Sequence, residues 1–237
     1  MSDKLPSHCN DQPHSHDIAS VNEQHYDLQA EAFDEYPGYE EISRVIGQAM
    51  LSKYPDIFDK ECTHILDYAC GTGLLSRQLW PHARSVIGVD ISKGAVDRYN
   101  LRVINEGADP SKIRAIRAEL KGEESELHGV KVDAVVCASA YHHFTSIDDM
   151  TRILVSFLKH GGSLLVADIM KNDQGEEVVP SDYYHDVPHT AGFSEEDMRQ
   201  IFTRAGLKNF DFNRVTTANL EGTDATFFLA RGVKRHA

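Results

Sequence analysis

The residues with the clearest chemical meaning lie between Asp67 and Gly73, where the chain reads Asp-Tyr-Ala-Cys-Gly-Thr-Gly. The apolar pair Ile65 and Leu66 precedes this stretch, and a helix-like pattern begins at Leu74. Small residues let the backbone pass close to a ligand, and the free N–H groups at a helix start favour an anionic group. A strand, a small-residue turn and a helix in this order form the nucleotide-binding corner of a doubly wound α/β sheet. The sequence therefore predicts a site for a nucleotide-like ligand at this turn.

A second carboxylate, Asp90, stands at the end of the next apolar run, Val86 to Val89. It follows Gly73 at close to the roughly 20 residues expected between a glycine-rich turn and a ribose-binding acid. A carboxylate can accept hydrogen bonds from both vicinal hydroxyls of a ribose, which explains an acid at a strand end. The alternative is that Asp90 caps the following helix, but Ser92 is better placed for that role.

Two adjacent histidines, His142 and His143, follow a later apolar segment that ends at Ala140. The ordinary pKa of histidine is near neutrality, so a histidine here could act as a general base or orient a substrate. The alternative is a structural histidine that closes the loop. A further histidine, His189, lies in the aromatic stretch Val178 to Phe193, and loops on a rigid scaffold commonly carry substrate contacts. We expect His143 and His189 to be the candidate bases, ahead of His142.

Alternating strands and helices must position these residues. Strands are expected at Thr63 to Tyr68, Ser85 to Asp90, Ile113 to Ala118, Val132 to Ser139, and Gly162 to Asp168. Helices are expected at Leu74 to Trp80, Lys93 to Glu106, Asp148 to Lys159, and Glu195 to Ala205. Two upstream helical segments are also expected, Glu23 to Tyr36 and Tyr39 to Lys53, with Pro37-Gly38 between them.

The C-terminal part predicts a β-hairpin. Phe210 to Arg214 and Ala225 to Arg231 read as two strands joined by a turn near Glu221-Gly222. Five strand–helix steps closed by this pair predict an α/β, doubly wound (Rossmann-like), mostly parallel seven-stranded sheet with a C-terminal antiparallel hairpin. We expect one domain over residues 21–237, preceded by a flexible tail at residues 1–20.

Composition narrows the class of partner. The 237 residues include 24 basic and 37 acidic side chains, a formal net charge of −13, which opposes a phosphate backbone and argues against nucleic acid. No run of about 18 apolar residues occurs, so no membrane span is expected. Four scattered cysteines without a Cys-x-x-Cys pair suggest neither a zinc site nor a disulfide framework, so we expect a reducing, cytoplasmic location.

The chain resembles the class I S-adenosylmethionine-dependent methyltransferases, close to the small-molecule branch (methyltransferase type 11/12-like) that includes ubiquinone-biosynthesis-type enzymes. The motifs cover roughly residues 26–230. In this family the turn usually reads Asp/Glu-x-Gly-x-Gly-x-Gly, and here Ala69 replaces the first glycine. The turn alone would also tolerate a dinucleotide, because Ser76 is small enough for the third position, but Asp67 before the turn favours a methyltransferase. The implied cofactor is S-adenosyl-L-methionine, with S-adenosyl-L-homocysteine as product.

The resemblance implies a contact for each part of that cofactor. Asp67 would help to hold the methionine end, Asp90 would bind the ribose, and Glu119 would accept from the adenine amino group. Ile91 and Leu120 would pack on the adenine ring. Glu119 stands where aspartate is commoner, and its alternative is a solvated loop acid. The implied cofactor-binding residues are Tyr26, Phe33, Asp67, Ala69, Cys70, Gly71, Gly73, Asp90, Ile91, Glu119, Leu120, Ala138 and Ser139.

Two further features follow from the resemblance. The pattern aromatic-Asp-x-x-Ala-x-x-aromatic-Asp, from Tyr26 through Phe33, forms part of a helical lid in relatives, where aromatic rings beside a sulfonium are favourable. Its alternative is ordinary core packing. Asp168 with Asp173 could suggest a divalent metal, as in catechol methylation, but other members of the family place an acid there without one, and no metal is expected.

The implied activity is methyl transfer by in-line displacement to a small-molecule acceptor with an O, S, N or C nucleophile, a secondary metabolite or thiol among the candidates. His143 or His189 would assist deprotonation if the acceptor atom is oxygen. The chain lacks the Asn/Asp-Pro-Pro-Tyr signature typical of enzymes that methylate nucleic-acid bases or glutamine. The alternatives are a non-catalytic S-adenosylmethionine-binding regulatory partner and a nicotinamide-dependent oxidoreductase.

Overall fold

A single mixed sheet forms the centre of the computed structural model, which describes residues 18–27, 37–172, 176–179, 187–220 and 223–235. Its strand order is β3-β2-β1-β4-β5-β7-β6. Strands β1 to β5 are parallel, and β7 runs antiparallel to both β5 and β6. The strands are β1 (His64–Tyr68), β2 (Ser85–Asp90), β3 (Ile113–Arg117), β4 (Val132–Ala138), β5 (Leu158–Ile169), β6 (Leu207–Leu220) and β7 (Thr223–Lys234). The predicted fold class is confirmed.

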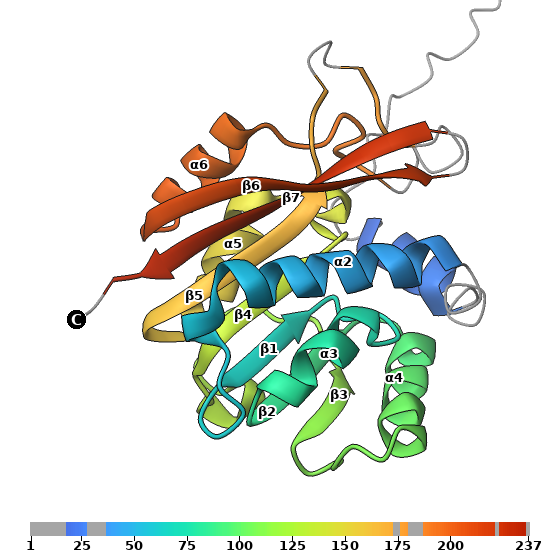
Figure 1. Cartoon of the computed structure of the whole chain (residues 1–237), viewed down its shortest axis with the longest axis vertical. Coiled ribbons are helices and arrows are strands. Elements are labelled where there is room, and N and C mark those ends of the chain that lie inside the picture. Colours follow the sequence, from blue (N-terminus) through green and yellow to red (C-terminus); the bar gives the residue numbers. More distant parts are fainter. Residues whose placement is uncertain (1–17, 28–36, 173–175, 180–186, 221–222, 236–237) are drawn as a thin grey trace, which may run out of the picture.

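Helices cover both faces of this sheet (Figure 1). They are α2 (Pro37–Lys53), α3 (Leu74–Leu79), α4 (Lys93–Asn105), α5 (Ile147–Ser156) and α6 (Glu195–Arg204), and a further helix occupies residues 18–27. Helices α2, α3 and α4 pack on one face, while α5 and α6 pack on the other. Among the described helices, none is both long and apolar enough to cross a membrane.

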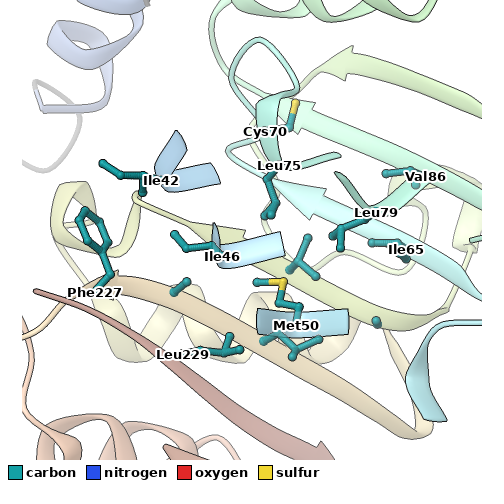
Figure 2. Close-up of a cluster of buried hydrophobic side chains, with 14 of the residues drawn as sticks. Ile42, Ile46, Met50, Ile65, Cys70, Leu75, Leu79, Val86, Phe227 and Leu229 are labelled. Atoms are coloured by element: carbon teal, nitrogen blue, oxygen red, sulfur yellow. The ribbon is translucent and has the colours of Figure 1, made fainter. Parts of the chain in front are cut away.

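Strand side chains alternate between two apolar clusters, as a sheet covered on both faces requires. Ile65 of β1 belongs to the cluster beneath α2, α3 and α4, and its neighbour Leu66 belongs to the cluster beneath α5 and α6. Figure 2 shows the first cluster, in which Ile46 and Met50 of α2 pack with Leu79 of α3. The sheet is thereby held rigidly enough for its strand ends to position a site.

Several element boundaries differ from the prediction. Strand β5 begins at Leu158, not at Gly162, and α5 ends at Ser156, not at Lys159. The reason is that Leu158 pairs with Val132 of β4, and the strand register shifts before the next pair, Ala134 with Ser163. Gly161, at φ +79, permits this irregular start. Pro37 and Gly38, which were expected to lie between two helices, form the start of α2. The fixed φ of proline suits the first helical turn. The hairpin strands are also longer than predicted. The upstream helix begins at residue 18, so residues 18–20 are helical.

The strand order reverses beside β1, with β2 and β3 on one side and β4 and β5 on the other. At such a switch point the connections leave β1 and β4 in opposite directions and open a crevice outside the carboxyl ends of the strands. The turn after β1 and the loop after β4 therefore frame a ligand site.

Candidate active site

A cavity of about 490 Å³ lies at the carboxyl ends of β1, β2 and β4. Its size falls within the roughly 300–1,000 Å³ typical of small-molecule sites. Many of the sequence-predicted residues line it, namely Tyr26, Asp67, Ala69, Cys70, Gly71, Asp90, Ile91, Glu119, Ala138, Ser139 and His143. The topology thus gathers side chains from five separate segments of the sequence around one space.

The glycines of the turn serve two different purposes. Gly71 has a φ of +51°, and a Cβ added there would meet no protein atom within 4 Å, so this position is open. Gly73 has a φ of +88°, and its added Cβ would lie 2.7 Å from Cδ2 of Tyr99. Gly71 leaves room in the cavity, whereas Gly73, which is not part of the described cavity wall, leaves room for Tyr99. Ala69 also has a positive φ, +54°, which explains why glycine is usual at this position.

Asp90 is fixed by backbone donors on both sides. Its Oδ2 accepts from the Gly71 N–H at 2.8 Å and its Oδ1 from the Ser92 N–H at 2.9 Å. Burial raises the pKa of Asp90, and the two N–H groups act in the opposite direction. Each oxygen keeps a further lone pair. The carboxylate is therefore oriented to accept from hydroxyls of a ligand.

Asp67 is the most deeply buried acid of the cavity wall, with 1% of its surface exposed. Its Oδ2 accepts the hydroxyl of Ser76 from α3 at 2.6 Å. Burial raises the pKa of Asp67 to about 7 against the effect of that hydrogen bond, and the nearby charge of Asp90 adds to the rise. The charge of this carboxyl group consequently changes near neutral pH.

The residues predicted to surround an adenine ring divide between the cavity and the core. Ile91 and Glu119 line the cavity, and the Glu119 side chain is exposed. Leu120 is buried in the apolar cluster beneath α5 and is not among the described lining residues. Its predicted contact with the cofactor remains a prediction.

An aspartate–histidine pair borders the cavity through His142. Nδ1 of His142 lies 2.7 Å from Oδ1 of Asp168, and Oδ2 of Asp168 accepts from the Tyr141 N–H at 2.8 Å. Burial alone would raise the pKa of Asp168, but the charge and hydrogen bond of His142 outweigh it and keep that pKa low. Because an ionised carboxylate only accepts, Nδ1 carries the hydrogen, and when the ring is neutral Nε2 of His142 is an acceptor.

His143 contacts the upstream helix instead. Its Nε2 lies 2.9 Å from the hydroxyl of Tyr26, which belongs to the helix at residues 18–27. This contact joins the loop after β4 to that helix across the cavity. Phe33, the other predicted aromatic of the lid, lies outside the described residues.

His189 is placed differently from the two other histidines. Its Nε2 lies 3.0 Å from the carbonyl oxygen of Phe144, so Nε2 carries the hydrogen. Burial lowers the pKa of His189, which favours the neutral ring. His189 is not among the described residues that line the cavity. Its role as a base stays a prediction.

Sequence reasoning missed Asn22. This side chain lines the cavity, is 6% exposed, and its Oδ1 has no hydrogen-bond partner in the described part of the chain. Asn22 lies one helical turn before Tyr26, so the spacing of four residues places both on one face. The four-residue spacing from Tyr26 could have identified Asn22. The helix was expected to begin at Glu23, one residue too late to include Asn22.

These features fit a nucleoside-containing cofactor. The open position beside Gly71, the two oriented oxygens of Asp90 and the unpartnered oxygen of Asn22 suit a ligand that carries hydroxyl or amine donors. Within the described ranges, no group of three or more His, Cys, Asp or Glu side chains could hold a metal ion. Asp168 is engaged with His142, and Asp173 lies outside the described residues.

Known proteins are similar to this chain in sequence and in fold. Residues 65–162 match the family model described as a methyltransferase domain. An uncharacterized methyltransferase of Schizosaccharomyces pombe is 31% identical over 186 residues, which is 75% of this chain and 64% of that protein. A ubiquinone biosynthesis O-methyltransferase of Coxiella burnetii is 28% identical over 109 residues, which is 46% of this chain and 44% of that protein.

A solved structure repeats the architecture. The magnesium protoporphyrin IX methyltransferase of Synechocystis PCC 6803, crystallised with bound S-adenosylhomocysteine, has a TM-score of 0.59 and 19% identity over 83% of this chain and 84% of that chain. At this identity the likeness concerns the fold alone. The chain spans less than two thirds of the length of both curated relatives, 64% and 44%. The glycine turn, the acids that surround it and the matches in sequence and fold make this chain similar to the class I S-adenosylmethionine-dependent methyltransferases, with residues 65–162 matching a methyltransferase domain.

Proposed function

We propose that the protein transfers the methyl group of S-adenosylmethionine to a small-molecule acceptor. The observation that carries the proposal is one cavity lined both by the Gly71–Asp90 corner and by His142, which is paired with Asp168. The relatives support it, since both curated proteins are named as methyltransferases. One cavity that contains both a cofactor-binding turn and a proton acceptor can hold two ligands side by side, which the transfer of a group between them requires.

The corner residues would hold the cofactor. Asp67 and the backbone at Gly71 would meet its methionine end, Asp90 its ribose, and Ile91 with Glu119 its adenine. Bound S-adenosylmethionine supplies a methyl group on a sulfonium, which a nucleophile attacks in line. The protein's part is to place that nucleophile and exclude water, which agrees with a wall that is largely apolar.

We infer that His142 is the proton acceptor when the acceptor atom is a hydroxyl oxygen. Asp168 holds Nδ1 of His142, so Nε2 can take the hydroxyl proton as the oxygen attacks, and the ionised Asp168 stabilises the charged ring that results. His143 instead contacts Tyr26 and joins the loop to the upstream helix. This assignment reverses the order of preference expected from the sequence.

The cofactor is tested by calorimetry of the full chain with S-adenosylhomocysteine and, separately, with NAD. We expect saturable binding of S-adenosylhomocysteine, and at one hundred times its Kd a rise of about 2.7 kcal/mol in the free energy of unfolding. Tight binding of NAD without binding of S-adenosylhomocysteine would contradict the proposal and support an oxidoreductase.

The role of His142 as general base is tested with His142→Gln after a substrate that is methylated on oxygen has been identified. We expect kcat to fall about 10²- to 10⁴-fold, with the affinity for S-adenosylhomocysteine retained. His189→Gln is the matched control and should keep most of its turnover. Unchanged turnover across pH in His142→Gln removes this base from the mechanism.

A further inference from the structure

One end of the cavity is walled by aliphatic and aromatic side chains that come from distant parts of the chain. We call this end the apolar lobe, and its residues are Ile42, Ile169, Val179, Val187 and Phe227. All five are buried in the same cluster, and Figure 2 labels Ile42 and Phe227 at the same end of that cluster. The lobe and His142 line the same cavity, and the backbone N–H of Ile169 donates to the Asp168 carboxylate at 2.7 Å.

Apart from its histidines, the ionisable side chains that line the cavity are acidic. Among the described residues that line it, none is lysine or arginine, whereas Asp67, Asp90, Glu119 and Asp149 all contribute to the wall. A carboxylate or phosphate drawn into the lobe would lose its water without gaining a lysine or arginine partner there, which is costly.

Binding a cationic group in the lobe would also be unfavourable. Asp67 and Asp90 lie at the glycine turn, where the cofactor is proposed to bind, and Glu119 follows β3 on that same side. Asp149 already accepts from Arg152 and Ser146. The lobe itself consists of five apolar side chains, so an ammonium placed among them would lack a carboxylate.

We infer that the methyl acceptor is an uncharged, largely apolar molecule that fills the lobe and presents its nucleophile to His142. This inference rests on the proposed function. It distinguishes this chain from enzymes that hold a carboxylate or phosphate of the acceptor with lysine or arginine side chains.

Three phenols of similar size test the inference. They are 4-propylphenol, which is neutral, 3-(4-hydroxyphenyl)propionate, which is anionic, and tyramine, which is cationic. We expect calorimetry on the full chain, saturated with S-adenosylhomocysteine, to show the neutral phenol binding at least about tenfold more tightly than either charged one. Equal or tighter binding of a charged phenol overturns the inference, and so does a lack of saturable binding by 4-propylphenol.

The same titrations tell this failure from that of the proposed function. If S-adenosylhomocysteine itself does not bind, the proposed function fails, and the assignment of the lobe to an acceptor fails with it. If S-adenosylhomocysteine binds and the neutral phenol is not preferred, only the inference about the acceptor is lost.

A pair of variants on α2 tests the electrostatic argument directly. Ser43 lines the cavity beside Ile42, and Ser52 lies exposed near the end of the same helix. Ser43→Lys should shift the preference toward 3-(4-hydroxyphenyl)propionate by about tenfold. Ser52→Lys makes the same change in net charge and should leave the preference as it is. Equal behaviour of the two variants overturns the inference.

Discussion

The buried acid at the end of β1 makes the stability of the protein depend on pH. The pKa of Asp67 is about 7 in the folded chain, because burial disfavours its charge. In the unfolded chain an aspartate has a pKa of about 3.9. Between these two values the folded state holds a proton that the unfolded state has lost, so the free energy of unfolding falls as the pH rises from about 4 to about 7.

Asp67→Asn should remove this dependence. The amide oxygen can still accept from Ser76, and no charge is buried, so we expect a gain on the order of 2–4 kcal/mol in the free energy of unfolding at pH 8 and a smaller gain at pH 5. Urea denaturation at the two pH values measures it, with the exposed Asp56→Asn as control. The affinity for S-adenosylhomocysteine should fall, because the carboxylate faces the cavity. A gain of the same size at both pH values would contradict the assignment.

The two glycines of the turn should respond differently to alanine. In Gly71→Ala the new methyl group meets no protein atom, so the loss of stability should be the roughly 1–2 kcal/mol of a left-handed alanine, while S-adenosylhomocysteine binding is lost. In Gly73→Ala the methyl group collides with Tyr99, and the loss should reach about 2–5 kcal/mol. Thermal unfolding and calorimetry on both variants measure this. Normal ligand affinity in a folded Gly71→Ala protein would place the ligand elsewhere.

At the scale of elements, the helix at residues 18–27 is attached to the sheet through its polar side chains. Oδ1 of Asp27 accepts from the Ser92 hydroxyl at 2.6 Å and from the Gly94 N–H at 2.9 Å, so it extends the cap of α4. The hydrogen bond from Ser92 is the main reason that the pKa of Asp27 is lowered. This contribution is present above the ordinary pKa of aspartate and is lost as the pH falls through the lowered value. Glu23 adds an ion pair with Arg117.

Asp27→Ala should loosen this helix without unfolding the domain. We expect faster amide hydrogen exchange over residues 18–27 and at the start of α4, with S-adenosylhomocysteine binding weakened roughly three- to tenfold, as expected for the loss of a cap. Asp97→Ala, which removes only an exposed ion pair with Lys93 on α4, is the control. Equal exchange rates in the two variants would show that Asp27 does not hold the helix.

Local signals were sufficient for some parts of the site and not for others. Ser92 as the cap of α4 and Asp90 at the end of β2 were predictable, because each depends on only a few neighbouring residues. The pairing of His142 with Asp168 was not, since it depends on the register between β4 and β5. The sequence shows two polar residues, and only the strand pairing brings them within hydrogen-bond distance.

At the scale of the whole molecule, the number and type of strands were predictable, and their boundaries less so. Each parallel strand is a short apolar run followed by a helical pattern. This pattern can be recognised in the sequence without knowing which strands pair with each other. The boundaries of β5 depended on a partner, because the glycines near its start resemble a loop until Leu158 pairs with Val132. The position of β7 between β5 and β6 likewise comes from pairing along both of its edges.

That position of β7 has a consequence for how the protein is made. Strand β7 (Thr223–Lys234) pairs with β5 and supplies Phe227 to the cavity wall, whereas the glycine turn lies some 150 residues earlier in the order of synthesis. When β1, β2 and α4 of a nascent chain have emerged from the ribosome, the chain has the residues of the glycine turn and of Asp90 but still lacks Phe227 of the cavity wall. On the proposed assignment of the apolar lobe, selectivity for the acceptor therefore arises only when nearly the whole of this sequence has been translated.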